Sequence, residues 1–310
     1  MIDSKYQKVY QAFGLNIMSD IRLPELPASL ATHIDVSFEL ADLHAKWSEV
    51  EHSNRYFLIK EKICLFKIPE VAIYLVQDGN MIKVSPFAGA NEDQIRLYLL
   101  GTCMGALLIQ KRILPLHGSA IAIEGKAYAI VGESGAGKST LASNFLRLGY
   151  ELISDDIIPI TFNEAGIPIV TPAYPQQKLW LESLEQFGME SNKYRPIFDR
   201  ETKFAVPVSQ QFATQSLPLA GVVELIKTND VEIEFKPIQN LSRLQTLYTH
   251  TYRNFFIGRS GLMNWHFQTT VKMCEHIDIY QLCRPTTRFT AHELTELILA
   301  SLYKEEKVYG

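Results

Sequence analysis

Val131-Gly-Glu-Ser-Gly-Ala-Gly-Lys-Ser-Thr140 matches the pattern G-x-x-x-x-G-K-[ST], and no other stretch of the 310 residues constrains the fold as tightly. Glycines in such a loop adopt backbone angles closed to other residues, so that several N–H groups converge on phosphate oxygens. Lys138 adds a positive charge at the β- and γ-phosphates, and the Ser139 hydroxyl is a ligand for Mg²⁺. The pattern predicts a nucleoside triphosphate site made of Gly132, Glu133, Ser134, Gly135, Ala136, Gly137, Lys138, Ser139 and Thr140.

The residues on either side of this loop have the pattern that phosphate binding needs. Residues 127–131 are apolar and predict a buried strand that runs into the loop. Residues 139–148 predict a helix that Gly149 ends, and residues 150–154 predict the next strand. Strand, loop, helix and strand make one βαβ unit, which indicates an α/β fold.

Asp155 and Asp156 follow the second predicted strand, at the end where open parallel sheets carry their functional residues. Two adjacent carboxylates beside a triphosphate can divide the work, one holding Mg²⁺ and the other accepting a proton from an attacking hydroxyl. A solvated Asp-Asp turn is the alternative interpretation. The nearby loop favours the functional one.

His117 lies upstream of the loop, in the segment Leu116-His-Gly-Ser-Ala120. A strand predicted at 121–124, a turn at Gly125-Lys126 and the strand that enters the loop follow it. This order places His117 near the start of a hairpin whose second strand ends at the phosphates. The spacing alone leaves a structural hydrogen bond and a catalytic role equally open.

Three segments in this order, LHGSAIAI, VGESGAGKST and LISDD within residues 113–160, resemble kinases of the HPr kinase/phosphorylase type. The core of that family is related to phosphoenolpyruvate carboxykinase. The resemblance implies ATP and Mg²⁺ as cofactors, and a histidine and paired aspartates that flank the transferred phosphoryl group, one aspartate acting as base toward a serine hydroxyl. The residues with an implied role are His117, Asp155 as the base and Lys138 in catalysis, and Ser139 and Asp156 at the metal.

The segment after the aspartate pair departs from that family. HPr kinases carry there an arginine- and glycine-rich stretch that recognises the HPr protein, whereas this chain reads Thr171-Pro-Ala-Tyr-Pro-Gln-Gln-Lys-Leu-Trp180. This stretch and the opening residues 10–26 resemble a bacterial HPr-kinase-like branch, in which some members phosphorylate the C-terminal serine of a lasso-type precursor peptide. The resemblance implies a serine kinase for a peptide or small protein, with HPr as the alternative substrate. Because authentic HPr kinases are hexamers, a homo-oligomer is a further expectation.

Other function classes fit the sequence less well. Transport-type ATPases share the loop G-x-S-G-x-G-K-S-T, but no L-S-G-G-Q segment follows it here. A nucleotide-binding regulatory protein without phosphotransfer is disfavoured by the aspartate pair and His117. A carboxykinase is disfavoured by the short chain.

The composition agrees with a cytoplasmic enzyme. The chain is 47% hydrophobic with a formal charge of −4, so it lacks the basic surface of a nucleic-acid-binding protein. Four cysteines without C-x-x-C spacing indicate free thiols in a reducing compartment. The start MIDSKYQKVY has no apolar signal segment, and the stretch 97–110 is shorter than the about 20 helical residues that span a bilayer. We therefore expect no membrane partner.

The pattern along the chain predicts two domains. Alternating apolar residues at 34–40, 56–60, 63–68 and 71–76 predict a mainly β N-terminal domain at 1–90. Asn91 and Gln94 resemble a capping box that opens a helix to about Lys111, at the start of a kinase domain at 91–310. Further predicted elements are a hairpin of strands 221–226 and 231–235, helices at about 240–254 and 260–276, and a helix capped by Thr290 that ends near Lys304.

Phosphoryl transfer also needs positive charge around the equatorial oxygens. The sequence does not rank the candidates, which are Lys178, Lys203, Arg253, Arg259, Arg284 and Arg288. Tyr174 and Trp180 are candidates for lining a peptide groove, although aromatic residues near prolines more often serve packing.

Overall fold

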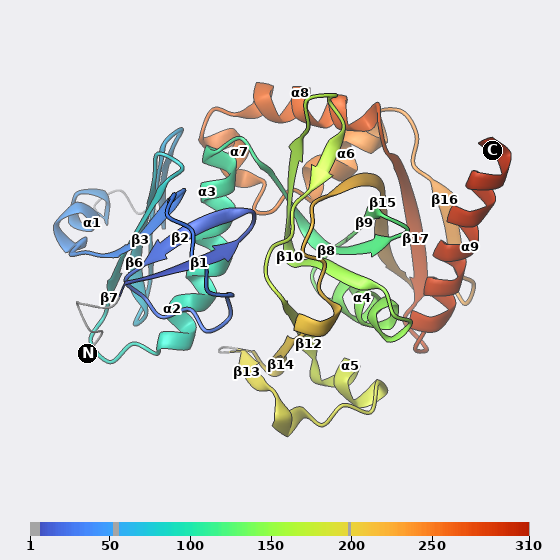
Figure 1. Ribbon diagram of the computed structural model, residues 1–310, viewed down its shortest axis with the longest axis horizontal. Coiled ribbons are helices and arrows are strands. Elements are labelled where there is room, and N and C mark those ends of the chain that lie inside the picture. The colour runs from blue at the N-terminus through green and yellow to red at the C-terminus, as the bar shows by residue number, and fades with distance from the viewer. Residues whose placement is uncertain (1–6, 52–55, 198–199, 310) are drawn as a thin grey trace.

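Strands form two large sheets and one small sheet in the computed structural model, which describes residues 7–51, 56–197 and 200–309 (Figure 1). The first large sheet has the order β1-β2-β3-β7-β6-β5-β4. Its strands are β1 Lys8–Ala12, β2 Leu15–Ser19, β3 Val36–Leu40, β4 Phe57–Lys60, β5 Ile63–Ile68, β6 Ala72–Gln77 and β7 Met81–Pro86, with helix α1 His44–Glu51 between β3 and β4. The alternating runs at 34–40, 56–60, 63–68 and 71–76 are thus confirmed as strands, while α1, β1, β2 and β7 were not predicted.

The second large sheet carries the phosphate loop. Its order is β11-β10-β8-β9-β15-β17-β16, and β11 also pairs with β15. Its strands are β8 Leu114–Ile123, β9 Lys126–Val131, β10 Glu151–Phe162, β11 Pro168–Val170, β15 Leu217–Thr228, β16 Glu234–Pro237 and β17 Asp278–Pro285. The small sheet has the order β12-β14-β13, with β12 Gln176–Trp180, β13 Arg195–Ile197 and β14 Arg200–Pro207.

Helices cover the second sheet and connect it to the first. They are α2 Glu92–Tyr98, a π turn Leu99–Cys103, α3 Met104–Gln110, α4 Lys138–Arg147, α5 Leu181–Gln186, α6 Leu241–Thr249, α7 Phe255–Arg259, α8 Met263–Cys274 and α9 Ala291–Tyr309, with 3-10 turns at Ser191–Lys193 and Ser209–Gln211. The predicted long helix after Asn91 is confirmed, because the Asn91 side chain accepts hydrogen bonds from the N–H groups of Asp93 and Gln94. Helix α3 lies between the two large sheets (Figure 1). None of the helices in the described residues is long and apolar enough to cross a membrane.

The predicted βαβ unit is a split one. Strand β10 pairs antiparallel with β8, and β8 pairs antiparallel with β9. Strands β9 and β10 therefore run in the same direction with β8 between them, whereas the neighbour parallel to β9 is β15. The prediction that the second strand ends at Ser154 is wrong, because the buried residues Ile157, Ile158 and Ile160 continue it to Phe162.

Two further predictions are wrong in their connections. The residues predicted as a hairpin form β15 and β16, but β17 lies between them because its buried Ile279 and Leu282 belong to the centre of the sheet. The helix predicted to reach residue 254 ends at Thr249. Beyond it the chain runs along β8, where the N–H of His117 donates to the carbonyl of His250 over 2.7 Å and that of Tyr252 donates to the carbonyl of Pro115 over 2.8 Å.

Candidate active site

The phosphate loop, residues 132–137, joins the end of β9 to the first turn of α4. Gly132 has a φ of 148°, and a Cβ there would lie 2.5 Å from the carbonyl oxygen of Leu225 on β15, so only glycine fits. Helix α4 is held in place by its buried residues Leu141 and Phe145. Its first N–H groups have no partners within the helix and favour an anion at this end.

Lys138 lies folded back over this loop. Its Nζ donates hydrogen bonds to the carbonyl oxygens of Gly132 (2.8 Å) and Glu133 (3.0 Å). The side chain is buried, and burial lowers the pKa of the amine while the Asp155 and Asp156 carboxylates raise it. The loop carbonyls therefore hold a cation at the place where the sequence predicts phosphate oxygens.

Asp155 is a buried acceptor of three hydrogen bonds. Its Oδ1 accepts from the hydroxyls of Ser119 (2.5 Å) and Ser139 (3.0 Å), and its Oδ2 accepts from the backbone N–H of Lys178 (2.8 Å). Asp155 thus links the phosphate loop, β8 and β12. The predicted metal ligand Ser139 lies beside Asp155 rather than beside Asp156.

Asp156 points to a different set of partners. Its Oδ2 lies 2.6 Å from Lys178 Nζ, and its Oδ1 lies 3.5 Å from His117 Nδ1. Burial would raise the pKa of Asp156, but the charge of Lys178 and its hydrogen bond hold it well below its ordinary value. The backbone of Asp156 has a φ of 79°, which is uncommon outside glycine and turns its side chain away from the regular strand direction.

His117 lies on β8 opposite Ile157 of β10. Its Nδ1 is 3.0 Å from the backbone oxygen of Asp156, and its ring packs beside Tyr252 with centroids 5.7 Å apart. Burial lowers the pKa of His117 more than Asp156 raises it, so the imidazole is mostly neutral at neutral pH. The neighbouring Gly118 leaves room for the strands, because a Cβ there would lie 2.2 Å from the oxygen of Ile130.

One cavity of about 630 Å³, which we call the catalytic cavity after the role that the sequence predicts for it, is lined by His117, Lys138, Ser139, Asp155, Asp156, Lys178 and Tyr252. Its walls are the phosphate loop, the two aspartates, residues 249–254, the π turn after α2, and the cations Lys178, Lys203 and Arg253. A second cavity of about 410 Å³ shares Gly137 and Thr140 with the first and contains Arg284 and Arg288. Of the six predicted cations, only Arg259 lies in neither cavity, and its guanidinium stacks over the ring of Phe255.

The side chains present fit a Mg²⁺ ion shared with a nucleotide. Ser139 and Asp155 offer hard oxygen donors on one side of the cavity, and Mg²⁺ in kinases takes only one or two carboxylates, the rest being phosphate oxygens and water. The described residues contain no group of three or more His, Cys, Asp or Glu that could hold a metal alone. A partial donor set of this kind suits an ion that arrives with its nucleotide.

Sequence reasoning missed one contributor to this site, Ser119, and did not rank another, Lys178. Ser119 was quoted without a role, yet its hydroxyl binds Asp155; an extended strand from Leu114 would have placed it on the same face as His117, two residues away. Lys178 was one of six unranked cations, and the structure makes it the partner of Asp156. This pairing depends on how β12 lies beside β10 in the fold, and no pattern that is local in sequence predicts such a contact.

Comparison with known proteins finds similar proteins both among curated sequences and among solved structures. No protein-family model matches the chain. HPr kinase/phosphorylase from Cupriavidus metallidurans is 25% identical over 173 residues, which are 56% of this chain and 47% of that protein. The match thus spans about half the length of the relative. The HPr(Ser) kinase/phosphatase structure from Coxiella burnetii has 14% sequence identity and a TM-score of 0.33, over 63% of this chain and 99% of that one. The sequence match to the Cupriavidus protein shows that the chain resembles HPr kinase/phosphorylases over part of its length.

Proposed function

We propose that the protein is an ATP- and Mg²⁺-dependent serine kinase of the HPr-kinase-like type that acts on a peptide or small protein in the cytoplasm. The observation that carries this proposal is the second carboxylate. Asp155 is engaged with the phosphate-loop serine, while Asp156 lies in the same cavity between a lysine and a histidine. A protein that only bound a nucleotide would not need this second, separately held acid.

The geometry favours a division of labour opposite to the one that the family's order implies. Asp155 contacts Ser139, so these two residues would hold the metal. Asp156 is then the group that accepts the proton of the acceptor hydroxyl. When bound, Mg²⁺ would neutralise charge on the phosphate oxygens.

Lys178 controls when Asp156 can act as a base. While the ammonium sits 2.6 Å from Asp156, the low pKa of this carboxylate makes it a poor proton acceptor. We infer that Lys178 turns toward the transferred phosphoryl group when it is present, which stabilises the developing charge and lets the pKa of Asp156 rise. His117 keeps the carboxylate aimed at the cavity, and its neutral ring adds no competing charge.

The second cavity, which we call the donor cavity, suits the nucleoside half of the ATP molecule. It begins at Gly137 and Thr140, where the phosphate loop becomes α4, and extends to Phe289. The Arg284 Nε donates to the carbonyl of Ala136 over 2.6 Å, so the guanidinium borders the loop. Phe289 is 37% exposed and offers a ring face for a base.

The finer proposal for the substrate is the C-terminal serine of a lasso-type precursor peptide. The supporting observation is the segment 171–180, which stands where HPr kinases have their HPr-recognising stretch and which here supplies β12 beside the aspartates. HPr itself is the alternative substrate. A homo-oligomer remains part of this proposal through the resemblance alone.

Mass spectrometry of a serine-ending precursor peptide and of HPr, each incubated with protein and Mg-ATP, tests this function. We expect one added phosphoryl group on the peptide, little on HPr, and none with the Lys138→Ala variant, which lacks the cation of the phosphate loop. Phosphorylation of HPr alone would contradict the peptide proposal, and transfer to neither would contradict the kinase proposal.

A further inference from the structure

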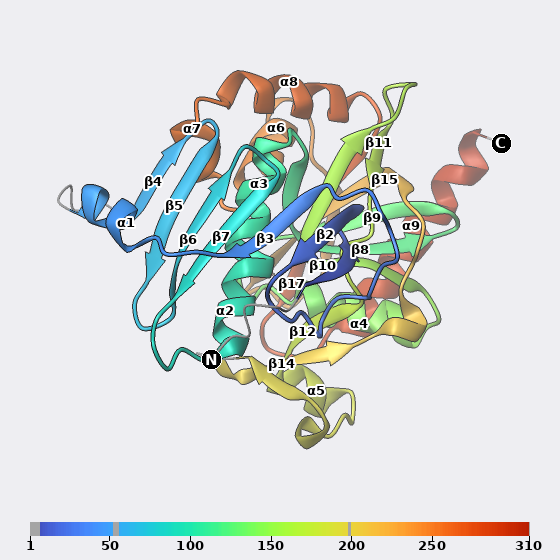
Figure 2. The same ribbon diagram turned by 60° about the vertical axis from the view of Figure 1, so that its left-hand side comes forward.

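A third cavity, of about 330 Å³, opens between the start of α2 and the small sheet. We call it the acceptor groove. Its lining residues are Pro24, Glu25, Asp93, Arg96, Leu97, Leu100, Tyr174, Gln176, Lys178, Lys193, Tyr194, Arg195, Pro196, Ile197, Ala205 and Pro207. Figures 1 and 2 both show α2 beside the small sheet, and the ion pair between Arg195 and Asp93, with N and O 3.3 Å apart, bridges the two walls.

The acceptor groove continues into the catalytic cavity along one face of β12. Gln176 lines only the groove, Lys178 lines both cavities, and Trp180 lines only the catalytic cavity. Alternate residues of a strand lie about 7 Å apart on the same face, so these three side chains mark a continuous path. The intervening Gln177 and Leu179 are buried on the other face, where Gln177 accepts from Ser143 of α4 over 2.8 Å.

The path reaches the reacting groups through a different opening from that of the donor cavity. The donor cavity joins the catalytic cavity at Gly137 and Thr140, whereas the acceptor groove joins it at Leu97, Lys178 and Ile197. The two openings share no lining residue. A hydroxyl that arrives through the acceptor groove would meet Asp156 and Lys178 before it meets the phosphate loop.

The charges in the acceptor groove select for an acidic occupant. Four of its lining side chains are basic and two are acidic, in a chain whose formal charge is −4. The acidic residues Glu25 and Asp93 are already paired with Arg96, which has 5% of its side chain exposed. The solvent-facing cations are Lys193 and Arg195, with 65% and 57% of their side chains exposed. Lys193 pairs with Glu190 and Arg195 pairs with Asp93, but exposed ion pairs are weak, so the carboxylates of a peptide can compete for these cations.

We propose that the acceptor groove binds an extended, acidic peptide segment and feeds its serine hydroxyl along β12 to Asp156. This proposal rests on the proposed kinase function and adds the route and the charge of the acceptor. A volume of about 330 Å³ lies at the small end of ligand pockets, which suits a few residues of extended chain rather than a folded domain. Glu25 Oε2, which is buried and receives no hydrogen bond from the described residues, offers an acceptor for a peptide N–H.

The test uses three serine peptides of one length, whose flanking residues are all Glu, all Gln or all Lys, with the full-length protein. Steady-state kinetics give KM for each peptide, and fluorescence anisotropy gives its binding without turnover. We expect the Glu peptide to have the lowest KM. Arg195→Glu should raise that KM at least fivefold and Arg195→Gln less, with the Kd for ATP unchanged, because neither substitution touches the phosphate loop. Lys236→Glu on β16 is the matched control, since Lys236 is 49% exposed, forms one ion pair and lies in no cavity described above.

The outcomes separate this inference from the kinase proposal. Phosphorylation of the Glu peptide with an unchanged KM in Arg195→Glu would overturn the acceptor groove and leave the kinase standing. Transfer only to a folded protein at a rate that Arg195→Glu leaves unaltered would overturn it as well. Charge-dependent peptide binding without any phosphotransfer would keep the groove and contradict the kinase proposal.

Discussion

The two adjacent carboxylates of this site, Asp155 and Asp156, have different neighbours. Asp155 accepts hydrogen bonds from two serine hydroxyls and a backbone N–H, whereas Asp156 faces an ammonium and an imidazole. The sequence shows only the pair Asp-Asp. The strand continues through both residues, so one side chain points to the phosphate loop and the positive φ of the other sends it toward Lys178.

The variants Asp155→Asn and Asp156→Asn should therefore differ in how they impair phosphoryl transfer. We expect each to lower kcat at least 10²-fold, a loss typical of acid–base or metal-positioning groups. Only Asp155→Asn should steeply raise the Mg²⁺ concentration needed for half-maximal rate, because only Asp155 lies beside Ser139. Asparagine tolerates a positive φ, so Asp156→Asn keeps the backbone. Titration of activity with Mg²⁺ measures the difference, and a steeper requirement in Asp156→Asn would restore the order that the family resemblance implies.

Lys178→Met should change the pH dependence as well as the rate. Without the ammonium, burial is the main effect left on Asp156, so the pKa of this carboxylate rises and the acid limb of the rate profile moves to higher pH. The backbone N–H of residue 178 still serves Asp155. The profile of kcat/KM against pH measures this shift. Lys203→Met, which changes a lysine over the ring of Trp180 in the same cavity, is the control and should shift the limb less.

Sequence patterns predicted which helices and strands form at the site better than they predicted which strands lie next to one another. The strand, loop and helix of residues 126–147 and the helix after Asn91 follow from apolar periodicity, glycine and capping, which are local in sequence. The order of strands is not local. β8 separates β9 from β10, and β17 separates β15 from β16, because buried residues far apart in the chain decide which strands are central. The pairing of Lys178 with Asp156 could not be predicted for the same reason, since it joins residues of two different strands.

The loop 250–254 is an element that the sequence assigned to a helix, and a histidine of α8 secures it. His266 Nε2 lies 2.7 Å from Thr251 Oγ1, and burial lowers the pKa of His266 to about 4. Thr251, Tyr252 and Arg253 of this loop line the catalytic cavity. Protonation of His266 would thus disturb both the fold and the site.

Stability should fall as the pH drops from about 6.5 to about 4. The folded state favours neutral His266, so its contribution is complete above the unfolded pKa of about 6.5 and is lost as the pH falls to the folded value. The shift corresponds to about 3 kcal/mol. Urea unfolding at several pH values measures it, with His266→Gln as the comparison, whose stability should change less over this range. Parallel pH curves for the two proteins would assign the loss to other groups.

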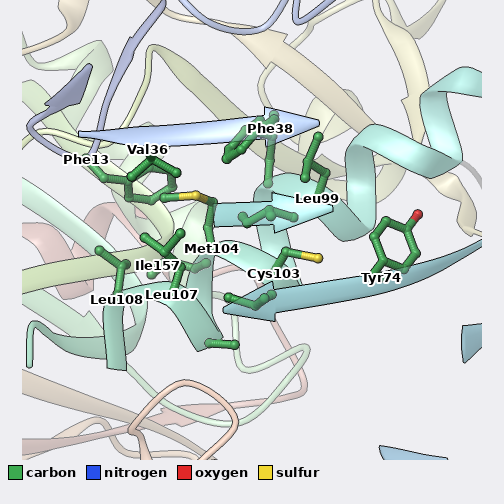
Figure 3. Close-up of a cluster of buried hydrophobic side chains, with 14 of the residues drawn as sticks. Phe13, Val36, Phe38, Tyr74, Leu99, Cys103, Met104, Leu107, Leu108 and Ile157 are labelled. Atoms are coloured by element: carbon green, nitrogen blue, oxygen red, sulfur yellow. The ribbon is translucent and has the colours of Figure 1, made fainter. Parts of the chain in front are cut away.

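In the molecule as a whole, the first and second large sheets both contribute to one hydrophobic core. Leu99, Met104 and Leu107 of the connecting helix pack in a cluster with Val36 and Phe38 of the first sheet (Figure 3). The same cluster contains residues that flank the site, namely Ile157 of β10, Tyr174, Tyr252 and Phe256. The helix also approaches the site closely, because a Cβ on Gly105 would lie 2.5 Å from the ring of Tyr252. The cavity itself is lined by residues between Leu97 and Asn254, but the hydrophobic core behind it is built by both halves of the chain.

The division of the chain between residues 90 and 91 is a proposal. The shared core predicts that the two parts on either side of this division do not fold independently. A chain of residues 91–310 would expose the face of its first helix that packs on β6, including Leu99, Cys103 and Leu107, which have 0% exposure in the whole protein. Burial of each such side chain is worth about 1.5–3 kcal/mol, so several of them together reach the total stability of an ordinary domain. We expect the fragment to aggregate or to show a molten amide spectrum, with no cooperative thermal transition and no binding of ATP. Calorimetry and two-dimensional NMR of the fragment, beside the full chain, check this. A fragment that melts cooperatively and binds ATP as tightly as the full chain would show that the helix belongs to the kinase part alone and that the first sheet only covers it.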